Sequence, residues 1–598
     1  MKTSDYIVSF LQKNSVKDVF LLAGGGIMHI LDSLAQNTGI NECYNLHEQA
    51  SGFCADGYAL FTGKTGVCIV TTGPGATNTV TAVASSYIDS TPIVYISGQV
   101  KTSDISKIPG VRQTGAQEVD IVSIVKPVTK YAVTITHADE IRYHLEKAFF
   151  IANHGRPGPV WLDIPLDVQG GHIDETKLKS FDPTAEGFEL PQKPDDATIA
   201  KVYQLLEKSK RPVIMVGSGV RLSHAENILL QLVSELRIPV VSSRRMRDFM
   251  KNDNDEMYFG CVGVLPHRYA NYILQNSDFM LSIGSGLRYY LTAYNEENFA
   301  PWAARVIVNI SDAELEKLNM NDSLKITSDA KTFIEAMLCY HDKSQPDRSK
   351  WFDYCNEMKR KYPAVLEFSP ENEEKVNPYQ VAHYIGKYMH DTDILVPSPS
   401  SFAYVFNVPH IHGRQRVISH IGLGSMGTAL PEAIGACVAS GKRTIVCEGD
   451  GSLQHNIQEL SLLRQYNLPI KVFVDVNAGY RQIYTMQNTH FSNRLAGCTP
   501  ESGISFPDLK LLAKAYGLKY CRIDSVHVME QQVKEALSDD EPVIIEMVTD
   551  FDMEYLPVIK SKMNADGSMQ TPSLEVLYPF LSEDEHRYNM RVGGCQDE

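Results

Sequence analysis

The sequence predicts an α/β protein made of three consecutive domains, each built on a doubly wound parallel sheet. Three observations support this prediction. Short runs rich in Val and Ile alternate with helix-like segments, the alternation starts afresh twice along the chain, and 598 residues are enough for three domains of ordinary size. The hydrophobic content of 43% is typical of a globular protein.

The first domain is expected to span residues 1–175. Strands separated by short helices predict parallel strands with right-handed crossovers and helices on both faces of the sheet. The helix-like segments cover residues 27–35, 49–61 and 76–87. The strand-like runs cover residues 18–23, 66–71, 92–97 and 159–164.

Two further blocks repeat this alternation. A polar, proline-containing stretch at residues 183–196 precedes a middle domain, which is expected at residues 190–345. The charged segment 343–375 leads to a third domain at residues 370–550, which opens near Asn377, and an irregular tail covers residues 551–598. The strand-like runs of these two blocks lie at residues 211–220, 238–242, 278–284, 305–310, 444–447, 470–474 and 541–548.

Composition and charge exclude several classes of function. The net charge is −16 and no run of Lys or Arg stands out, which argues against a nucleic-acid partner. The 11 cysteines form no CxxC pair, as expected for thiols in a reducing compartment rather than for a zinc or disulfide framework. No apolar run approaches the ~18 residues of a membrane span, and Asp5 stands where a signal peptide would be apolar. A cytoplasmic protein without membrane association is expected.

The most informative motif is Gly449-Asp450-Gly451, which stands where the strand-like run 444–447 ends. A helix-like segment at residues 456–466 and a second strand-like run follow, and Asn477 lies just past that run. Because parallel strands end at the same edge of a sheet, Asp450 and Asn477 are expected to lie together. A carboxylate and an amide oxygen in that position suit Mg²⁺.

Gly449, Gly451 and Ser452 extend this predicted site. They leave backbone N–H groups and a helix N-terminus open to a diphosphate. Mg²⁺ usually takes few protein ligands and shares phosphate oxygens, so the sequence predicts a site for a diphosphate together with this metal.

This stretch resembles the thiamine diphosphate motif, in which Gly-Asp-Gly is followed by Asn at the end of the next strand. The family usually has two adjacent asparagines there, and this chain keeps only Asn477, within Asp475-Val476-Asn477-Ala478. Further segments resemble acetolactate synthase-like enzymes in order along the chain, and the resemblance implies that the three domains are pyrimidine-binding, middle and diphosphate-binding. The matching segments are Glu48 and residues 73–78, 156–165, 422–427 and 456–460.

The resemblance also implies a role for each matching residue. Glu48 would act on N1′ of the aminopyrimidine, and Gln117 would line the reaction pocket. The Gly424 carbonyl would accept from the 4′-amino group, and Met426 would hold the two cofactor rings in a bent arrangement. The metal ligands would be Asp450, Asn477 and the backbone carbonyl of Gly479. Further cofactor contacts would come from Gly73, Asn78, Gly449, Gly451, Ser452 and Tyr480.

The same resemblance implies partners. In the family the domain that carries the glutamate and the domain that binds the metal meet across a subunit boundary. A homodimer or homotetramer with active sites between subunits is therefore expected. FAD occupies the middle domain of acetolactate synthases, whereas related enzymes keep the fold without it, so FAD stays an open alternative for this chain.

The acceptor pocket departs from the family. Ala116 stands where acetolactate synthases have a phenylalanine, Met486 replaces a tryptophan, and Tyr290 aligns with the arginine that grips the acceptor's carboxylate. Arg288, nearby, is a substitute for that arginine. These changes predict a wider and less anionic pocket. The expected pocket residues are Gly25, Gly26, Ala116, Arg288, Tyr290 and Met486.

The predicted function is decarboxylation of a 2-keto acid, pyruvate first, with transfer of the two-carbon unit to a bulky carbonyl acceptor such as a sugar ketone. A true acetolactate synthase is the nearest alternative. A C–C hydrolase acting on a cyclic diketone and a catalytically silent regulatory homologue are two others.

One competing motif points elsewhere. Gly422, Gly424 and Gly427 form a literal GxGxxG, with Glu448 at the distance of a ribose-binding acid, which is typical of a dinucleotide fold. That interpretation leaves Glu48, Asp450 and Asn477 unexplained, and it places Pro431 inside the helix.

Overall fold

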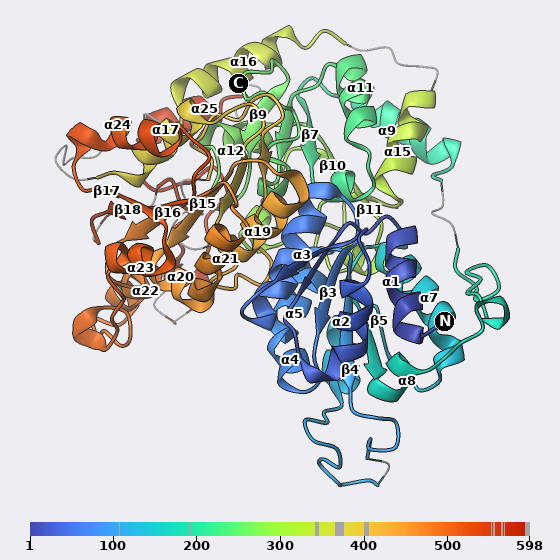
Figure 1. Ribbon diagram of the computed structural model, residues 1–598. Helices are drawn as coiled ribbons and strands as arrows, with labels where there is room; N and C mark the ends of the chain where they lie inside the picture. Colours follow the sequence, from blue (N-terminus) through green and yellow to red (C-terminus); the bar gives the residue numbers. More distant parts are fainter. Residues whose placement is uncertain are drawn as a thin grey trace.

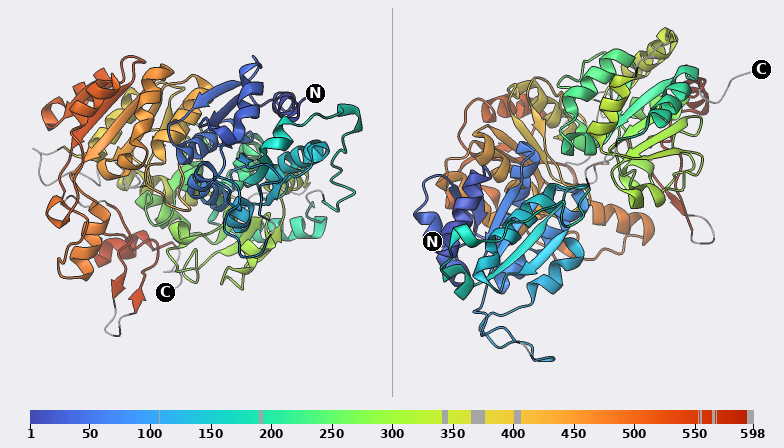
Figure 2. Two further views of the ribbon diagram at one scale, coloured as in Figure 1. Left: turned by 60° about the horizontal axis from the view of Figure 1, so that its bottom comes forward. Right: turned by 90° about the vertical axis from the view of Figure 1, so that its right-hand side faces the viewer.

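The computed structural model contains three six-stranded parallel sheets, one in each domain, as predicted. The domain of the first sheet and that of the third lie side by side, and the middle domain packs against both (Figure 1). Figure 2 shows helices on both faces of each sheet. The structure describes residues 1–106, 108–189, 193–340, 346–364, 376–399, 406–551, 553, 556–563, 566 and 568–592.

The first sheet has the strand order β2-β1-β3-β4-β6-β5. Its strands are β1 (Asp18–Leu21), β2 (Asn41–Tyr44), β3 (Gly66–Val70), β4 (Ile93–Gln99), β5 (Tyr131–Thr134) and β6 (Val160–Pro165). Its principal helices are α1 (Thr3–Lys13), α2 (Met28–Ala35), α3 (Glu48–Thr62), α4 (Pro74–Asn78), α5 (Val80–Asp89), α6 (Ile121–Val125), α7 (Ile141–Asn153) and α8 (Leu166–Gly170).

The middle sheet has the order β12-β11-β10-β7-β8-β9. Its strands are β7 (Pro212–Val216), β8 (Val240–Ser242), β9 (Tyr258–Cys261), β10 (Phe279–Ile283), β11 (Ala304–Asn309) and β12 (Leu324–Thr327). Its helices are α9 (Asp196–Lys208), α10 (Gly219–Leu222), α11 (Glu226–Leu236), α12 (Arg268–Gln275), α13 (Tyr289–Thr292), α14 (Asp312–Glu316), α15 (Ala330–Cys339) and α16 (Ser349–Lys361). The charged segment predicted at 343–375 is helical in α16, and its residues 343–345 and 365–375 lie outside the described residues.

The third sheet has the order β14-β13-β15-β16-β18-β17. Its strands are β13 (Ile394–Pro397), β14 (Arg416–Val417), β15 (Thr444–Gly449), β16 (Ile470–Val476), β17 (Lys519–Ile523) and β18 (Val543–Val548). Its helices are α17 (Pro378–Tyr388), α19 (Ala429–Ser440), α20 (Asp450–Leu453), α21 (Leu460–Gln465), α22 (Arg481–His490), α23 (Leu509–Tyr516) and α24 (Val526–Ala536).

Two predicted helices are interrupted. The helix expected at residues 76–87 is divided at Thr79 into α4 and α5, and the Thr79 hydroxyl donates to the Ala76 carbonyl at 2.6 Å. Such local side-chain hydrogen bonds compete with the helical pattern. In the segment expected at 456–466, Asn456 has non-helical angles and a 3₁₀ turn precedes α21.

The C-terminal tail packs on the middle domain. Asn271 on α12 donates to the Leu574 carbonyl at 2.7 Å, and Leu574 itself is buried in the apolar core of that domain. The tail holds a short hairpin, β19 (Lys562–Met563) with β20 (Met569–Gln570), and a last helix, α25 (Glu583–Asn589). The prediction of an irregular tail therefore missed its two regular elements.

Helix α3 of the first domain packs closely against helix α19 of the third domain (Figure 1). A Cβ atom added to Gly57 would lie 2.1 Å from the Glu432 carbonyl oxygen, and one added to Gly435 would lie 1.9 Å from that of Cys54. The two backbones approach so closely that only glycine fits at these positions. Within the described residues, none of the helices combines the length and apolar character needed to cross a membrane.

Candidate functional site

The ends of β15 and β16 bring Asp450 and Asn477 together, as the sequence predicts. The two strands are parallel neighbours, and Gly449 pairs with Asp475. Asp450 Oδ2 accepts from the backbone N–H of Asn477 at 3.1 Å and from that of Ala478 at 2.7 Å. Asp450 is thereby held at the carboxyl edge of the sheet, facing the end of the next strand.

The residues at this edge fit a hard cation. Asn477 Oδ1 is buried and has no hydrogen-bond partner among the described residues. Burial, followed by the charge of the neighbouring Asp475, raises the pKa of Asp450 to about 7. A buried carboxylate beside an unsatisfied amide oxygen is a donor set that Mg²⁺ completes.

Tyr480 and Gly479 complete the cluster around Asp450. A Cβ atom on Gly451 would lie 2.3 Å from the Tyr480 ring, so the ring packs directly on Gly451. The Tyr480 N–H donates to the Cys498 carbonyl at 2.9 Å, which fixes the chain after Asn477. We call Asp450, Gly451, Asn477, Gly479 and Tyr480 the Asp450 half-site.

The segment that carries Gly424 and Met426 is tied to this half-site. The Gly427 N–H donates to Ser452 Oγ at 2.9 Å, and the Gly427 carbonyl accepts from Asn456 at 2.8 Å. Gly424 has a φ of 70°, in the left-handed region that favours glycine. Met426 is 38% exposed, as is suitable for a side chain that contacts a ligand or a second chain.

Glu48 opens α3 at the carboxyl edge of the first sheet. His47 caps this helix, since its ring Nδ1 accepts from the Gln49 N–H at 3.2 Å. The Glu48 side chain is buried, and Asn78 Nδ2 donates to its Oε2 at 2.9 Å, which is its one hydrogen bond within the described residues. The predicted Glu48 and Asn78 therefore meet.

Gly73 and Gln117 lie beside them. Gly73 has a φ of 66°, and a Cβ atom there would lie 2.6 Å from the Gln117 carbonyl oxygen. Gly26 is anchored nearby, because its N–H donates to Thr71 Oγ1 at 2.9 Å. We call Gly26, Glu48, Gly73, Asn78 and Gln117 the Glu48 half-site. Gly25 adjoins it in the chain, and a Cβ atom added there would have no other atom within 4 Å.

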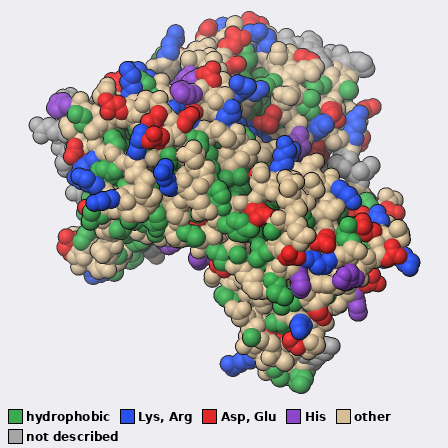
Figure 3. Space-filling model, viewed as in Figure 1, with side chains coloured by type: hydrophobic (Ala, Val, Ile, Leu, Met, Phe, Trp, Pro, Cys, Tyr) green, Lys and Arg blue, Asp and Glu red, His purple; other side chains and the backbone are tan. Residues whose placement is uncertain are grey.

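The two half-sites do not meet within one chain through any hydrogen bond of the described residues. The partner of Glu48 lies in the first domain, and those of Asp450 lie in the third. The loop between β4 and α6, which carries Ala116 and Gln117, projects from the bottom of the first domain, away from β15 and β16 (Figure 1). Hydrophobic side chains gather along the hollow between these domains (Figure 3).

A pocket between the middle and third domains holds the predicted Tyr290. The other residues that line it include Arg244, Tyr289 and Gln482 from three separate elements, and Val558 and Ile559 from the tail. Gln482 and Met486 stand one turn apart on α22, so they share a helix face. We call this the acceptor pocket.

Two arginines, Arg288 and Arg244, lie near this pocket, and only Arg244 lines it. Arg288 donates to the Ile88 carbonyl at 2.6 Å and lies 3.6 Å from the Asp89 carboxylate, on the side of a neighbouring cavity. Arg244 lines both the acceptor pocket and that cavity. Sequence analysis missed Arg244, although a basic pair directly after the strand-like run 238–242 was a usable signal.

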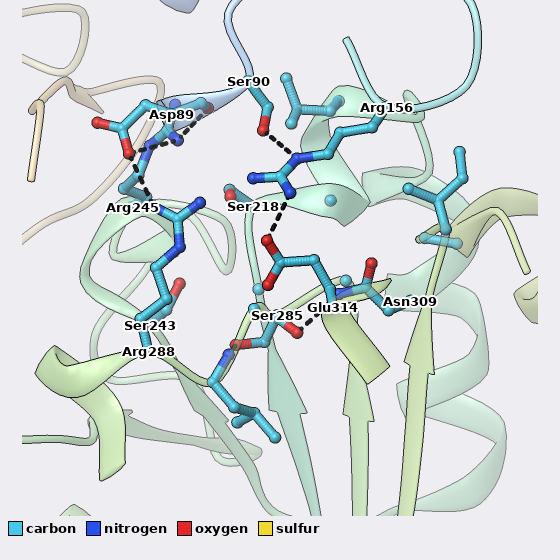
Figure 4. A pocket seen from close by; sticks show the side chains of 18 of the residues that line it. Asp89, Ser90, Arg156, Ser218, Ser243, Arg245, Ser285, Arg288, Asn309 and Glu314 are labelled. Carbon is cyan, nitrogen blue, oxygen red and sulfur yellow. Dashed lines mark hydrogen bonds and ion pairs between the residues drawn. The ribbon is translucent and has the colours of Figure 1, made fainter. Parts of the chain in front are cut away.

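The neighbouring cavity lies at the carboxyl ends of β7, β10 and β11. Its walls include the glycine turns at residues 217–219 and 284–286. Arg156 and Glu314 form an ion pair at 2.6 Å in its wall, and Asp89 lies with Arg245 and Arg288 on the other side (Figure 4). This position at the end of a doubly wound sheet is typical of nucleotide sites.

Comparison with known proteins gives the chain three family matches. Residues 1–124 match the N-terminal TPP binding domain of thiamine pyrophosphate enzymes, residues 199–337 match their central domain, and residues 400–547 match their C-terminal TPP binding domain.

Several relatives are similar over nearly the whole chain. A probable acetolactate synthase large subunit of Methanococcus aeolicus is 31% identical and covers 92% of each chain. An acetolactate synthase large subunit of Lactococcus lactis is 31% identical over 94% of this chain and 95% of its own. The chloroplastic acetolactate synthase 1 of Zea mays is 32% identical over 94% of this chain and 87% of its own.

Proposed function

This chain belongs to the thiamine pyrophosphate enzymes, among their acetolactate synthase-like members, and we propose that it decarboxylates pyruvate and joins the two-carbon unit to a second 2-keto acid. With pyruvate as donor and acceptor, two molecules give one acetolactate and one CO₂. The observation that carries the proposal is the Asp450 half-site, where a buried carboxylate accepts from the Asn477 backbone N–H and the buried side-chain oxygen of Asn477 lacks a donor among the described residues.

Thiamine diphosphate, when bound, supplies a carbon nucleophile that is also an electron sink. The chain's own residues hold and orient it. Asp450, Asn477 and the Gly479 carbonyl are proposed to bind Mg²⁺, and the N–H groups of Gly451 and Ser452 to bind the diphosphate. Glu48 holds a proton at the aminopyrimidine, with Asn78 fixing its carboxylate at 2.9 Å.

Complete sites are proposed to form between two copies of the chain. The Glu48 half-site of one chain and the Asp450 half-site of another would close on the cofactor in a homodimer or homotetramer. The projecting loop of Ala116 and Gln117 and the exposed Leu423, at 40%, support this arrangement. Light scattering of the purified protein tests it, and a monomeric active enzyme would contradict it.

A bulkier acceptor is the second candidate, although the relatives favour a 2-keto acid. The acceptor pocket supports it, because Tyr290 stands in its wall and Met486 is not among the residues that line it, although it lies one turn after Gln482 on α22. Release of CO₂ and formation of product from pyruvate, Mg²⁺ and thiamine diphosphate should be followed across a panel of acceptors. Efficient acetolactate formation supports the first proposal, and turnover only with larger ketones or aldehydes supports the second.

FAD is proposed for the cavity of the middle domain. The fit rests on Arg156, Arg245 and Arg288, which outnumber the two carboxylates that pair with them in the wall, and on serines at residues 218 and 285. The visible absorbance of the purified protein tests this proposal directly. A colourless protein that acquires no colour on incubation with FAD would contradict it.

A further inference from the structure

A buried cluster of four side chains joins the first and third domains away from both half-sites. His420, in the segment between β14 and α19, is 1% exposed and lies at its centre. Asp56 of α3 and Glu432 of α19 are on one side of the imidazole, and Asp89 at the end of α5 is on the other. Four ionisable groups thus meet at a buried point of the domain boundary, where His420 also borders the acceptor pocket and Asp89 the neighbouring cavity.

Three potential ligand atoms lie close together on the Nε2 side of His420. One oxygen from Asp56, one from Glu432 and His420 Nε2 all lie within 4.8 Å of each other. His420 Nε2 contacts the Asp56 carboxylate and lies 3.7 Å from Glu432 Oε1. Neither His420 Nε2 nor Glu432 Oε1 has a hydrogen bond among the described residues, although both are buried.

The other ring nitrogen, Nδ1, has two neighbours, the Asp89 carboxylate and the Ser85 hydroxyl at 3.2 Å. His420 Nδ1 lies 2.9 Å from Asp89 Oδ2, and Asp89 is flanked by Arg245 at 3.8 Å and Arg288 at 3.6 Å. When Asp89 accepts from Nδ1–H, Nε2 is the ring atom left to face Asp56 and Glu432. In protein metal sites, a histidine that binds the metal through one ring nitrogen usually donates the N–H of its other ring nitrogen to a carboxylate. His420 has this arrangement, with Asp89 at Nδ1 and the two further ligands at Nε2.

We propose that Asp56, His420 and Glu432 bind a divalent transition metal, with zinc as the best match. One imidazole nitrogen and two carboxylate oxygens suit zinc, whereas Mg²⁺ prefers oxygen ligands alone. The metal would neutralise the charges of Asp56 and Glu432, two of the three clustered carboxylates. Within the described residues, no Lys or Arg forms an ion pair with either of these two.

The role that follows is structural. Asp56 lies two turns C-terminal to Glu48 on α3. His420 lies four residues before Gly424, in the segment that is proposed to contact the cofactor. A metal here would fix α3, that segment and α19 relative to one another. This site is separate from the Mg²⁺ ligands at Asp450 and Asn477.

The metal content of the full-length protein tests the proposal. After dialysis against metal-free buffer, with Mg²⁺ and thiamine diphosphate then supplied in excess, mass spectrometry should find about one zinc per chain. Glu432→Gln, which keeps the side chain's shape, should lose most of it. Glu459→Gln should retain it, because that buried glutamate accepts hydrogen bonds from Asn45 at 3.0 Å elsewhere on the domain boundary. Asp450→Asn should also retain it.

Two further readouts decide the case. X-ray absorption at the zinc edge should show nitrogen and oxygen ligands with one imidazole and no sulfur. A strong chelator should lower the melting temperature of the unmodified protein and leave that of Glu432→Gln unchanged. Protein that contains no zinc and takes up none on titration would overturn the proposal, and the cluster would then be held by protons. Equal zinc in the unmodified protein and in Glu432→Gln would mean an adventitious ion only, and would overturn it as well.

Discussion

At the scale of single residues, Glu48 is the group whose chemistry is most specific. Glu48→Gln should preserve the fold and cofactor binding, because an amide keeps the shape and still meets Asn78. It should lower turnover and slow exchange of the cofactor's C2 proton by roughly 10²- to 10⁴-fold, since an amide cannot hold the required proton. Exchange is measured by NMR. In the control variant Glu42→Gln, on β2, the C2 proton of the cofactor should exchange at the normal rate. A normal exchange rate in Glu48→Gln would contradict the role assigned to Glu48.

Arg244 offers a second residue-scale prediction. If it binds the acceptor's carboxylate, Arg244→Gln should raise the KM for a 2-keto acid acceptor by roughly 10- to 150-fold, from loss of a charge-assisted hydrogen bond worth about 1.5–3 kcal/mol. The initial release of CO₂ from pyruvate should change far less. Arg237→Gln, an exposed arginine on the same domain, is the control. An unchanged KM would exclude Arg244 from acceptor binding.

Ala116 provides the complementary test. Ala116→Phe should suppress a bulky acceptor much more than decarboxylation, because it fills space beyond the cofactor without touching Glu48. Product formation with small and large acceptors is compared in competition. Equal losses with both acceptors would mean that Ala116 does not contact the acceptor.

Asp163 gives a pH dependence of stability. Burial raises the pKa of this β6 carboxyl to about 7, against hydrogen bonds from Ser97 at 2.6 Å and Gln99 at 3.1 Å. A raised folded pKa means that the folded state binds more protons, so stability present at low pH is lost as pH rises through about 7. Asp163→Asn should therefore gain stability relative to the unmodified protein between about pH 5 and about pH 8, by up to about 1.4 kcal/mol per pH unit.

Urea unfolding at the two pH values measures this effect. The control Asp167→Asn should show a pH-independent offset over the same interval, because hydrogen bonds from Thr102 outweigh burial there and lower the pKa of Asp167. A relative stability of Asp163→Asn that does not change with pH would show that Asp163 is ionised in the folded state throughout.

At the scale of elements, the crossing of α3 and α19 sets the distance between the first and third domains. Gly57→Ala would place a Cβ atom 2.1 Å from the Glu432 carbonyl oxygen. Because this oxygen belongs to the backbone of α19, the clash can be relieved only by moving one of the two helices. The substitution should destabilise the protein by about 1–3 kcal/mol. Gly25→Ala, where nothing lies within 4 Å of the added atom, is the matched control. Equal melting temperatures for the two variants would mean that the helices separate easily.

At the scale of the whole molecule, the two half-sites are proposed to complete each other across two chains. Mixing inactive Glu48→Gln with inactive Asp450→Asn under exchange conditions should restore up to about a quarter of normal activity. Half of the dimers would be mixed, and each mixed dimer would hold one site free of both substitutions. Mixtures that stay inactive although mass spectrometry shows mixed dimers would place complete sites within single chains.

The sequence by itself determined the three parallel sheets and the pairing of Asp450 with Asn477. Both follow from local rules: strands and helices alternate with a recognisable period, and neighbouring parallel strands end at one edge. The same reasoning located Glu48 at a helix start, because a polar residue there precedes an uninterrupted helical pattern.

Only the tertiary structure decided which distant side chains meet. Arg244 rather than Arg288 lines the acceptor pocket, and Arg288 turns to Asp89 of the first domain. The meeting of Asp56 with His420, from two domains, depends on the way α3 packs on α19. No local period encodes such contacts, since they arise when separately folded domains bury their remaining surfaces against each other.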